Sequence, residues 1–229
     1  MQISNTKQSG FTLVEMIVSL AVFSVVVTIA VGALLALITS NERLQNEQSV
    51  MTNLSFALDS MTRELRTGFH YFCDAQMAPN AGAHKIFADG INSGITTDLD
   101  TELEVGGIPL KQDCATGRGG NTWQGVAFVE GGNSITGAAD DRILYFYHED
   151  TGKIYRRVGA GPAQSIVSSG IVITDAEFYV TGSKPLSEGA PDYLDQASIT
   201  IYIEAREVDD PQAKPYRVQT TVTQRTADV

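Results

Sequence analysis

The sequence predicts an α+β protein in which one long N-terminal helix packs on a C-terminal antiparallel sheet. Residues 16–38 form an almost unbroken apolar run, and residues 40–67 continue it without proline and with apolar residues spaced by three and four. Strand patterns gather only after residue 125. A helical segment followed by a group of strands is typical of the α+β class. The length of 229 residues suits one domain plus a separate anchor.

The charge balance is acidic. The chain has 27 acidic and 16 basic residues and a formal net charge of -11. Such a surface repels nucleic acids and anionic lipid headgroups on average, although the basic pair Arg156 and Arg157 acts against this locally. We therefore expect no direct nucleic-acid partner.

The apolar run predicts a transmembrane helix over residues 11–39. Its polar interruptions are Ser19, Ser24 and Thr28, and no charged residue follows before Glu42. Spanning a bilayer takes about 20 apolar residues, whereas the apolar part of a secretory signal peptide has roughly 7 to 15. The run is thus an anchor, with membrane lipid as its expected surroundings.

The charges flanking the run predict its orientation. Lys7 and the free amine precede it, whereas Glu42, Arg43 and Glu47 follow and nearly cancel. Because positive charge favours the cytoplasmic side, we expect a single pass through the cytoplasmic membrane with the N-terminus inside. The C-terminal domain would then be periplasmic or extracellular.

A carboxylate lies inside the apolar segment, at Glu15. A charge at the bilayer centre costs roughly 2.5 to 3.5 kcal/mol, so an ionised Glu15 needs a partner. Cleavage between Gly10 and Phe11 would create an α-amine one helical turn away, within or between subunits. The alternative is a glutamate near the membrane interface with no special role.

Residues 9–26, SGFTLVEMIVSLAVFSVV, resemble the class III leader of type IV pilins and type II secretion pseudopilins. The resemblance implies that residues 1–10 are a leader cut after Gly10 by a membrane prepilin peptidase, which also methylates the amine of Phe11. It implies that Glu15 recruits the subunit to a growing filament. The implied partners are other pilin or pseudopilin subunits and an inner-membrane assembly platform.

The anchor departs from the major pilins at Gly32, where they often carry proline. A glycine there lowers helix stability by about 1 kcal/mol relative to alanine and allows the helix to stretch locally. We therefore expect helix flexibility at Gly32.

Residues 40–67 predict an amphipathic helix continuous with the anchor. Its apolar stripe consists of Met51, Leu54, Leu58, Met61 and Leu65, and Gly68 follows as a stop signal. The whole helix, residues 11–67, would be about 85 Å long at the α-helical rise. A sheet on one face would cover the stripe, and a coiled coil with a partner is the alternative.

Residues 142–229 predict the antiparallel sheet, to which residues 125–130 add a further strand. Residues 142–158 read as a hairpin that turns at Asp150, Thr151 and Gly152, while residues 197–206 and 216–225 alternate apolar and polar side chains. This order of elements resembles the minor pseudopilins of the J or W type.

Between the helix and the sheet, residues 68–141 predict a loop-rich variable insert, because glycine, asparagine, threonine and aspartate are frequent. Trp123 within it is either an exposed contact or a side chain packed on the sheet. Cys73 and Cys114 are compatible with one disulfide outside the cytoplasm, or with two unpaired, small apolar side chains.

No residue pattern indicates catalysis, so we expect a protein that is not an enzyme and has no cofactor. Calcium is a minor alternative, either on an acidic run that equally suits a solvated strand face or in C-terminal loops. The acidic candidates are Asp98, Asp100, Glu102 and Glu104 in the run, and Asp192, Asp195, Asp209 and Asp210 in the loops. The three histidines, His70, His84 and His148, lack the spacing of a helical metal pair.

Together these features predict a minor type IV pilin or pseudopilin. Such a subunit primes or caps a membrane-anchored filament that serves secretion, DNA uptake, adhesion or motility. The alternative is a single-pass adhesin or ligand-binding protein that is not part of a filament.

Overall fold

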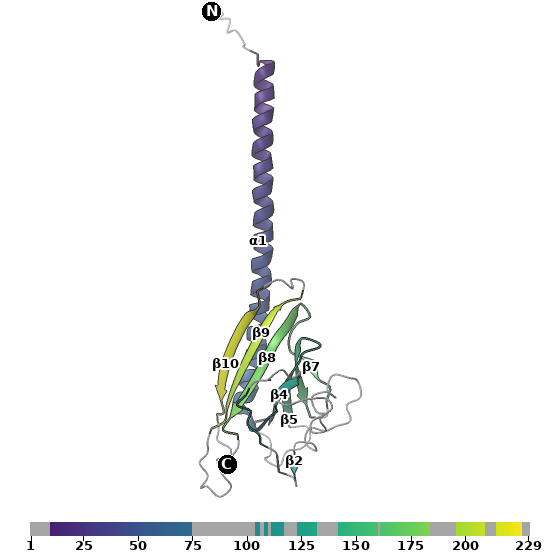
Figure 1. Cartoon of the computed structure of the whole chain (residues 1–229), viewed down its shortest axis with the longest axis vertical. Coiled ribbons are helices and arrows are strands. Elements are labelled where there is room, and N and C mark those ends of the chain that lie inside the picture. The colour runs from purple at the N-terminus through teal and green to yellow at the C-terminus, as the bar shows by residue number, and fades with distance from the viewer. Residues whose placement is uncertain are drawn as a thin grey trace, which may run out of the picture. The chain divides into compact units, whose positions relative to one another are not determined.

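The computed structural model describes residues 10–74, 104–105, 108–109, 111–116, 123–131, 142–159, 161–183, 196–208 and 214–225. The chain forms two compact units, Met1–Glu47 and Gln48–Val229. Helix α1, Leu13–Thr67, contributes its first part to one unit and its last part to the other (Figure 1). The predicted α+β class is confirmed.

In the second unit, α1 buries one stripe of side chains against the sheets. The buried residues of the helix are Val50, Leu54, Ala57, Leu58, Met61 and Leu65. Their spacing of three and four is that of an amphipathic helix, as predicted. The prediction of Met51 as part of the stripe is wrong, because its side chain is 54% exposed and the neighbouring Val50 is buried instead. Since the strands of the same chain share this core, the stripe needs no coiled-coil partner.

Helix α1 ends where glycine is required by packing. Gly68 donates its amide to the carbonyl of Glu64 at 3.0 Å. A Cβ atom added to Gly68 would lie 2.3 Å from Cδ2 of Phe128. The glycine predicted as a stop is thus needed because the Phe128 ring lies against the backbone.

Among the described residues, ten strands follow the helix, all paired antiparallel within three sheets. Figure 1 labels several of them, among them β8, β9 and β10 of one sheet. The order in the largest sheet is β1-β4-β5-β6-β7, in the second β10-β9-β8 and in the smallest β2-β3. The bounds are β1 (Phe69–Asp74), β2 (Glu104–Val105), β3 (Ile108–Pro109), β4 (Trp123–Val129), β5 (Arg142–His148), β6 (Lys153–Val158), β7 (Gln164–Ser165), β8 (Ile171–Thr181), β9 (Ser198–Glu207) and β10 (Tyr216–Thr223).

The predicted hairpin is confirmed as β5 and β6. Its turn places Gly152 at φ 59°, a left-handed conformation that favours glycine, and the Gly152 amide donates to the carbonyl of Glu149 at 3.0 Å. Strands β9 and β10 also form where the alternation predicts them.

Two parts of the sheets differ from the expectation. The range 68–141, expected to be rich in loops, begins with β1, which pairs with β4, the strand expected at residues 125–130. Strand β8 has no counterpart in the sequence analysis, because a register shift between Ile173 and Asp175 interrupts its alternation. The other residues of 68–141 lie mainly outside the described residues.

A short segment joins the two larger sheets. Gln112 forms a parallel bridge with Phe72 of β1, and Cys114 forms an antiparallel bridge with Val180 of β8. A disulfide links Cys114 to Cys73, the neighbour of Phe72, with Cα atoms 5.6 Å apart. The predicted disulfide therefore crosslinks β1 to the short segment that joins the two larger sheets.

The Gln124 side chain forms a second link between the sheets. From β4 its Nε2 donates to the Phe178 carbonyl at 2.8 Å, and its Oε1 accepts from the Phe178 amide at 3.1 Å. Gln124 is fully buried, so these two bonds replace the hydrogen bonds to water that its side-chain amide loses on folding.

Glu64 joins the helix to the large sheet. One carboxylate oxygen accepts from the Tyr145 hydroxyl at 2.6 Å and from Nε of Arg156 at 3.0 Å. The side chains of Arg156 and Glu64 are only 30% and 26% exposed. Burial and the hydrogen bond to Glu64 raise the pKa of Tyr145, so its hydroxyl remains a donor at physiological pH.

We predict that removing the disulfide destabilises the second unit. The cysteines are 41 residues apart, and the double substitution Cys73→Ser, Cys114→Ser should lower the free energy of unfolding by roughly 4 kcal/mol through loop-closure entropy. Urea unfolding of oxidised protein measures the change, and reduced wild type is the matched control. Equal stability of the oxidised and reduced wild type would contradict the prediction.

We also predict that Glu64 and Tyr145 are energetically coupled. A double-mutant cycle with Glu64→Gln and Tyr145→Phe should give a coupling of about 1 to 2 kcal/mol, because the bond is charge-assisted and partly buried. The control is a cycle on Asp59 and Arg63, whose side chains are 71% and 80% exposed. That cycle should give less than about 0.5 kcal/mol. Equal coupling in the two cycles would be inconsistent with the prediction.

Candidate functional site

The candidate site is the start of α1, where an accessible peptide bond precedes the helix. Phe11 is 80% exposed, and helical structure begins only at Leu13. A Cβ atom added to Gly10 would meet no heavy atom of the described residues within 4 Å. The bond between Gly10 and Phe11 is thus open to a protease, as the processing hypothesis requires.

Thr12 and Glu15 form a reciprocal cap on the helix. The Glu15 amide donates to Oγ1 of Thr12 at 3.3 Å, and the Thr12 amide donates to Oε2 of Glu15 at 3.3 Å. This arrangement is a capping box, which satisfies two amides that have no partner inside the helix. The positive end of the helix dipole also stabilises the negative charge of the carboxylate.

The cap fixes where the Glu15 charge lies. Its Oε2 atom also accepts from the Thr12 hydroxyl, at 3.4 Å. The carboxylate is therefore held at Thr12, the residue next to the amine that cleavage would create on Phe11. An anion held there can attract that amine or the amine of a neighbouring subunit.

Sequence reasoning did not assign this role to Thr12. The threonine three residues before a glutamate, at the start of an apolar run, was the signal that could have revealed it. Thr12 holds Glu15 in place and is thereby a positioning residue.

The polar interruptions of the anchor make their hydrogen bonds inside the helix. The hydroxyls of Ser19, Ser24 and Thr28 donate to carbonyls four residues earlier at 2.7, 2.8 and 2.8 Å. Such bonds leave no hydroxyl unsatisfied in a hydrocarbon layer. These residues are thus compatible with a membrane.

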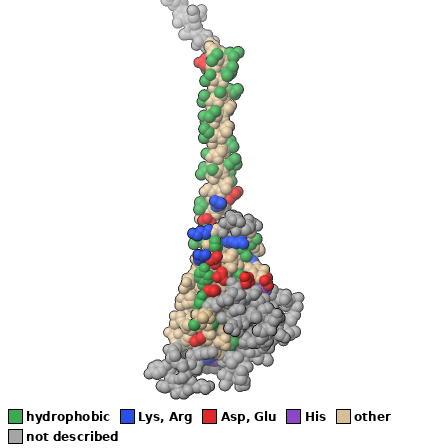
Figure 2. Space-filling view, viewed as in Figure 1, with side chains coloured by type: hydrophobic (Ala, Val, Ile, Leu, Met, Phe, Trp, Pro, Cys, Tyr) green, Lys and Arg blue, Asp and Glu red, His purple; other side chains and the backbone are tan. Residues whose placement is uncertain are grey.

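The anchor exposes apolar side chains on all sides. Residues 13–49 are all exposed, and Figure 2 shows hydrophobic side chains along this part of the helix. Among the described residues, α1 is long and apolar enough to cross a membrane, and its most apolar window is not buried. A helix that is apolar all round requires surroundings other than water.

Gly32 lies within this exposed helix without interrupting it. The helix is continuous there, and a Cβ atom added to Gly32 would meet no described heavy atom within 4 Å. Packing inside the chain thus does not require glycine at this position. Its predicted role in flexibility stays a prediction.

The remaining candidates lie elsewhere or outside the described residues. Cys73 and Cys114 lie in the second unit, as do His70 and His148, while the Trp123 and Glu104 side chains are not described. His84 and the other seven calcium candidates fall outside the described residues. Within the described part, no three His, Cys, Asp or Glu side chains are grouped as a metal site requires.

Comparison with known proteins agrees with this geometry. The family model for the prokaryotic N-terminal methylation motif matches residues 5–31. The match includes Gly10, Phe11 and Glu15. No curated protein and no solved structure matches the chain.

The chain therefore carries a leader and an apolar helix of the type IV pilin-like class, which supports the pilin and pseudopilin family. This motif implies processing by a prepilin peptidase and assembly with other pilin subunits. The helix fits the single-pass membrane anchor that is typical of pilins.

We predict that Thr12 stabilises the first turn of α1. Replacing Thr12 by valine removes the hydroxyl that accepts the hydrogen bond from the Glu15 amide. This should lower the stability of the first turn by about 1 kcal/mol, so the first helical amides should exchange roughly fivefold faster. Hydrogen exchange of the precursor in detergent micelles measures this. Thr12→Ser keeps the hydroxyl and is the control, so equal exchange in the two variants would refute the cap.

Proposed function

We propose that this protein is a minor type IV pilin or pseudopilin, processed after Gly10 and assembled into a membrane-anchored filament. The observation that carries the proposal is the accessible Gly10–Phe11 bond next to a capped Glu15 at the start of an exposed apolar helix. A simple anchor needs neither a cleavable bond nor a carboxylate. A filament subunit uses both.

The proposed mechanism has two stages. In the membrane, lipid surrounds the apolar part of α1, with the leader in the cytoplasm and the second unit in the periplasm. After the peptidase removes residues 1–10 and methylates Phe11, the same helix leaves the lipid and packs among the helices of other subunits. Opposite charges on Glu15 and a neighbouring amine bring the subunits into register.

We assign the protein to a minor role that primes or caps the filament, in secretion, DNA uptake, adhesion or motility. The resemblance of its helix, hairpin and terminal strands to J or W type pseudopilins supports this role. The proposed role is structural and not enzymatic, and it uses no cofactor. Calcium in the C-terminal loops stays a minor alternative.

The first prediction is the processed N-terminus. Protein purified from membranes of cells that contain a prepilin peptidase should begin at a methylated Phe11, and intact-mass spectrometry measures this. Gly10→Val should retain the leader, because a branched side chain obstructs the exposed bond. An intact Met1 terminus in the unsubstituted protein would favour the alternative, a membrane-anchored adhesin or ligand-binding protein outside any filament.

The second prediction separates the charge of Glu15 from its cap. Glu15→Gln keeps an oxygen that can accept from the Thr12 amide but removes the charge, whereas Glu15→Ala removes both. Both variants should be cleaved normally and enter sheared filaments about tenfold less than wild type, since each leaves the amine without a counter-charge. Quantitative immunoblotting of the filament fraction measures the loss. Normal incorporation of Glu15→Gln would overturn the charge-pairing role.

A further inference from the structure

The outer face of the three-stranded sheet carries a shallow pocket of about 450 Å³. Five residues line this tyrosine pocket: Glu177, Tyr179, Thr200, Tyr202 and Gln219. The alternate residues of β9, such as Ile199, Ile201 and Ile203, are buried in the core. Strand alternation thus points the pocket residues away from the core.

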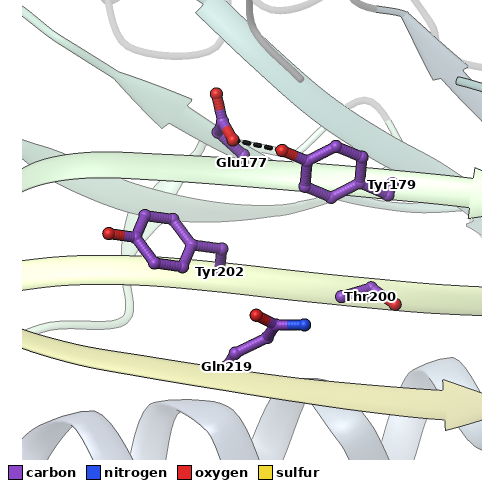
Figure 3. Close-up of a pocket in the computed structure, with 5 residues that line it drawn as sticks. All are labelled: Glu177, Tyr179, Thr200, Tyr202 and Gln219. Carbon is purple, nitrogen blue, oxygen red and sulfur yellow. Dashed lines mark hydrogen bonds between the residues drawn. The ribbon is translucent and has the colours of Figure 1, made fainter. Parts of the chain in front are cut away.

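The register of the strands brings these side chains together. Glu177 of β8 lies opposite Tyr202 of β9, which lies opposite Gln219 of β10. In the next row, Tyr179 lies opposite Thr200. Figure 3 shows the five side chains on three neighbouring strands, with the Tyr179 hydroxyl directed at Glu177.

Both tyrosines donate their hydroxyl protons to carboxylates. The Tyr179 hydroxyl donates to Oε2 of Glu177, and the Tyr202 hydroxyl donates to Oε2 of Glu204 at 3.2 Å. A phenol that donates to an anion has a more electron-rich ring, which strengthens its attraction for a cation. The hydrogen bond to Glu177, followed by burial, raises the pKa of Tyr179 to about 12, as expected in anionic surroundings.

Among the residues that the structure describes, no cation lines the pocket, and the nearest basic residue in the strand register is already paired. Arg217 of β10 lies opposite Glu204, and its Nε donates to that carboxylate at 2.5 Å. The negative charge of Glu177 is therefore left for a ligand. The pocket offers this carboxylate, two aromatic rings and the oxygens of Thr200 and Gln219.

We propose that the tyrosine pocket binds the cationic end of a lysine or arginine side chain on a partner protein with a basic surface. A cation is attracted both by Glu177 and by the rings of Tyr179 and Tyr202. The oxygens of Thr200 and Gln219 accept hydrogen bonds from the ligand or from the peptide group beside it. Because this chain has a net charge of -11, a second copy is repelled on average, and the partner is a different, basic protein.

The test uses the processed full-length protein in uncharged dodecyl maltoside micelles, with carbon-13 in the tyrosine rings. Two blocked tripeptides are titrated, Gly-Arg-Gly and its neutral counterpart with citrulline in place of arginine. The ring signals of Tyr179 and Tyr202, assigned through Tyr→Phe variants, should shift with the arginine peptide only. Equal shifts with the citrulline peptide, or no shift with either, would overturn the proposal.

Two matched variants test whether the arginine peptide binds in the tyrosine pocket. Glu177→Gln keeps an acceptor for the Tyr179 hydroxyl but removes the charge, and should weaken arginine-peptide binding about threefold to tenfold. Glu130→Gln removes an exposed charge that does not line the pocket and should leave binding unchanged. Equal weakening by both variants would mean a nonspecific effect of net charge and would refute the site.

A further arm separates a protein partner from a free small cation. Guanidinium ion alone should bind more weakly than the arginine peptide, because it lacks the peptide groups that Thr200 and Gln219 contact. Equal binding would identify a small-cation site and reject the protein partner. These outcomes do not depend on leader cleavage or filament assembly, so they leave the proposed function to its own tests.

Discussion

Every apolar surface of α1 must be shielded from water, and the rest of the molecule depends on how this is achieved. In the second unit, the chain shields one stripe, Val50 to Leu65, with its own sheets. In the first unit, the helix is apolar all round over residues 16–38, and no part of its most apolar window is buried within the chain. Lipid or other helices must supply that cover, which is why this protein cannot be understood as an isolated molecule.

The start of the helix combines a structural and a chemical role in the same few atoms. The carboxylate of Glu15 caps the first turn through Thr12, so it is held in place even before the proposed cleavage would create a counter-charge. A pre-positioned carboxylate loses little conformational entropy when a partner arrives. The cap thus reduces the cost of keeping a charge next to an apolar segment, and leaves that charge available for the proposed assembly.

The second unit is held together by contacts between residues that are distant in sequence. Cys114 bridges β8 and is bonded to Cys73 of β1, while Gln124 of β4 bonds the backbone of Phe178. Glu64 adds a polar link between the helix and the large sheet. These links tie the two sheets and the helix to one core. The three-stranded sheet has one face on this core, and its outer face carries the tyrosine pocket.

The sequence by itself determined the features that depend on local pattern. The apolar run, the stripe of α1, the hairpin turn at Gly152 and the alternation of β9 and β10 follow from spacing, because helices and strands repeat with fixed periods. The methylation motif is also local, and it matches residues 5–31. The capping box of Thr12 and Glu15 could also have been predicted from the spacing of these two residues.

Only the tertiary structure decided what depends on pairing between distant segments. Strand β8 was hidden because its bulge changes the alternation, and its neighbours could be known only from the sheet. Glycine is needed at position 68 because Phe128, sixty residues later, lies against it. The tyrosine pocket exists because the register of three strands aligns Glu177, Tyr202 and Gln219. Register is set by the packing of the whole core, and no short stretch of sequence contains it.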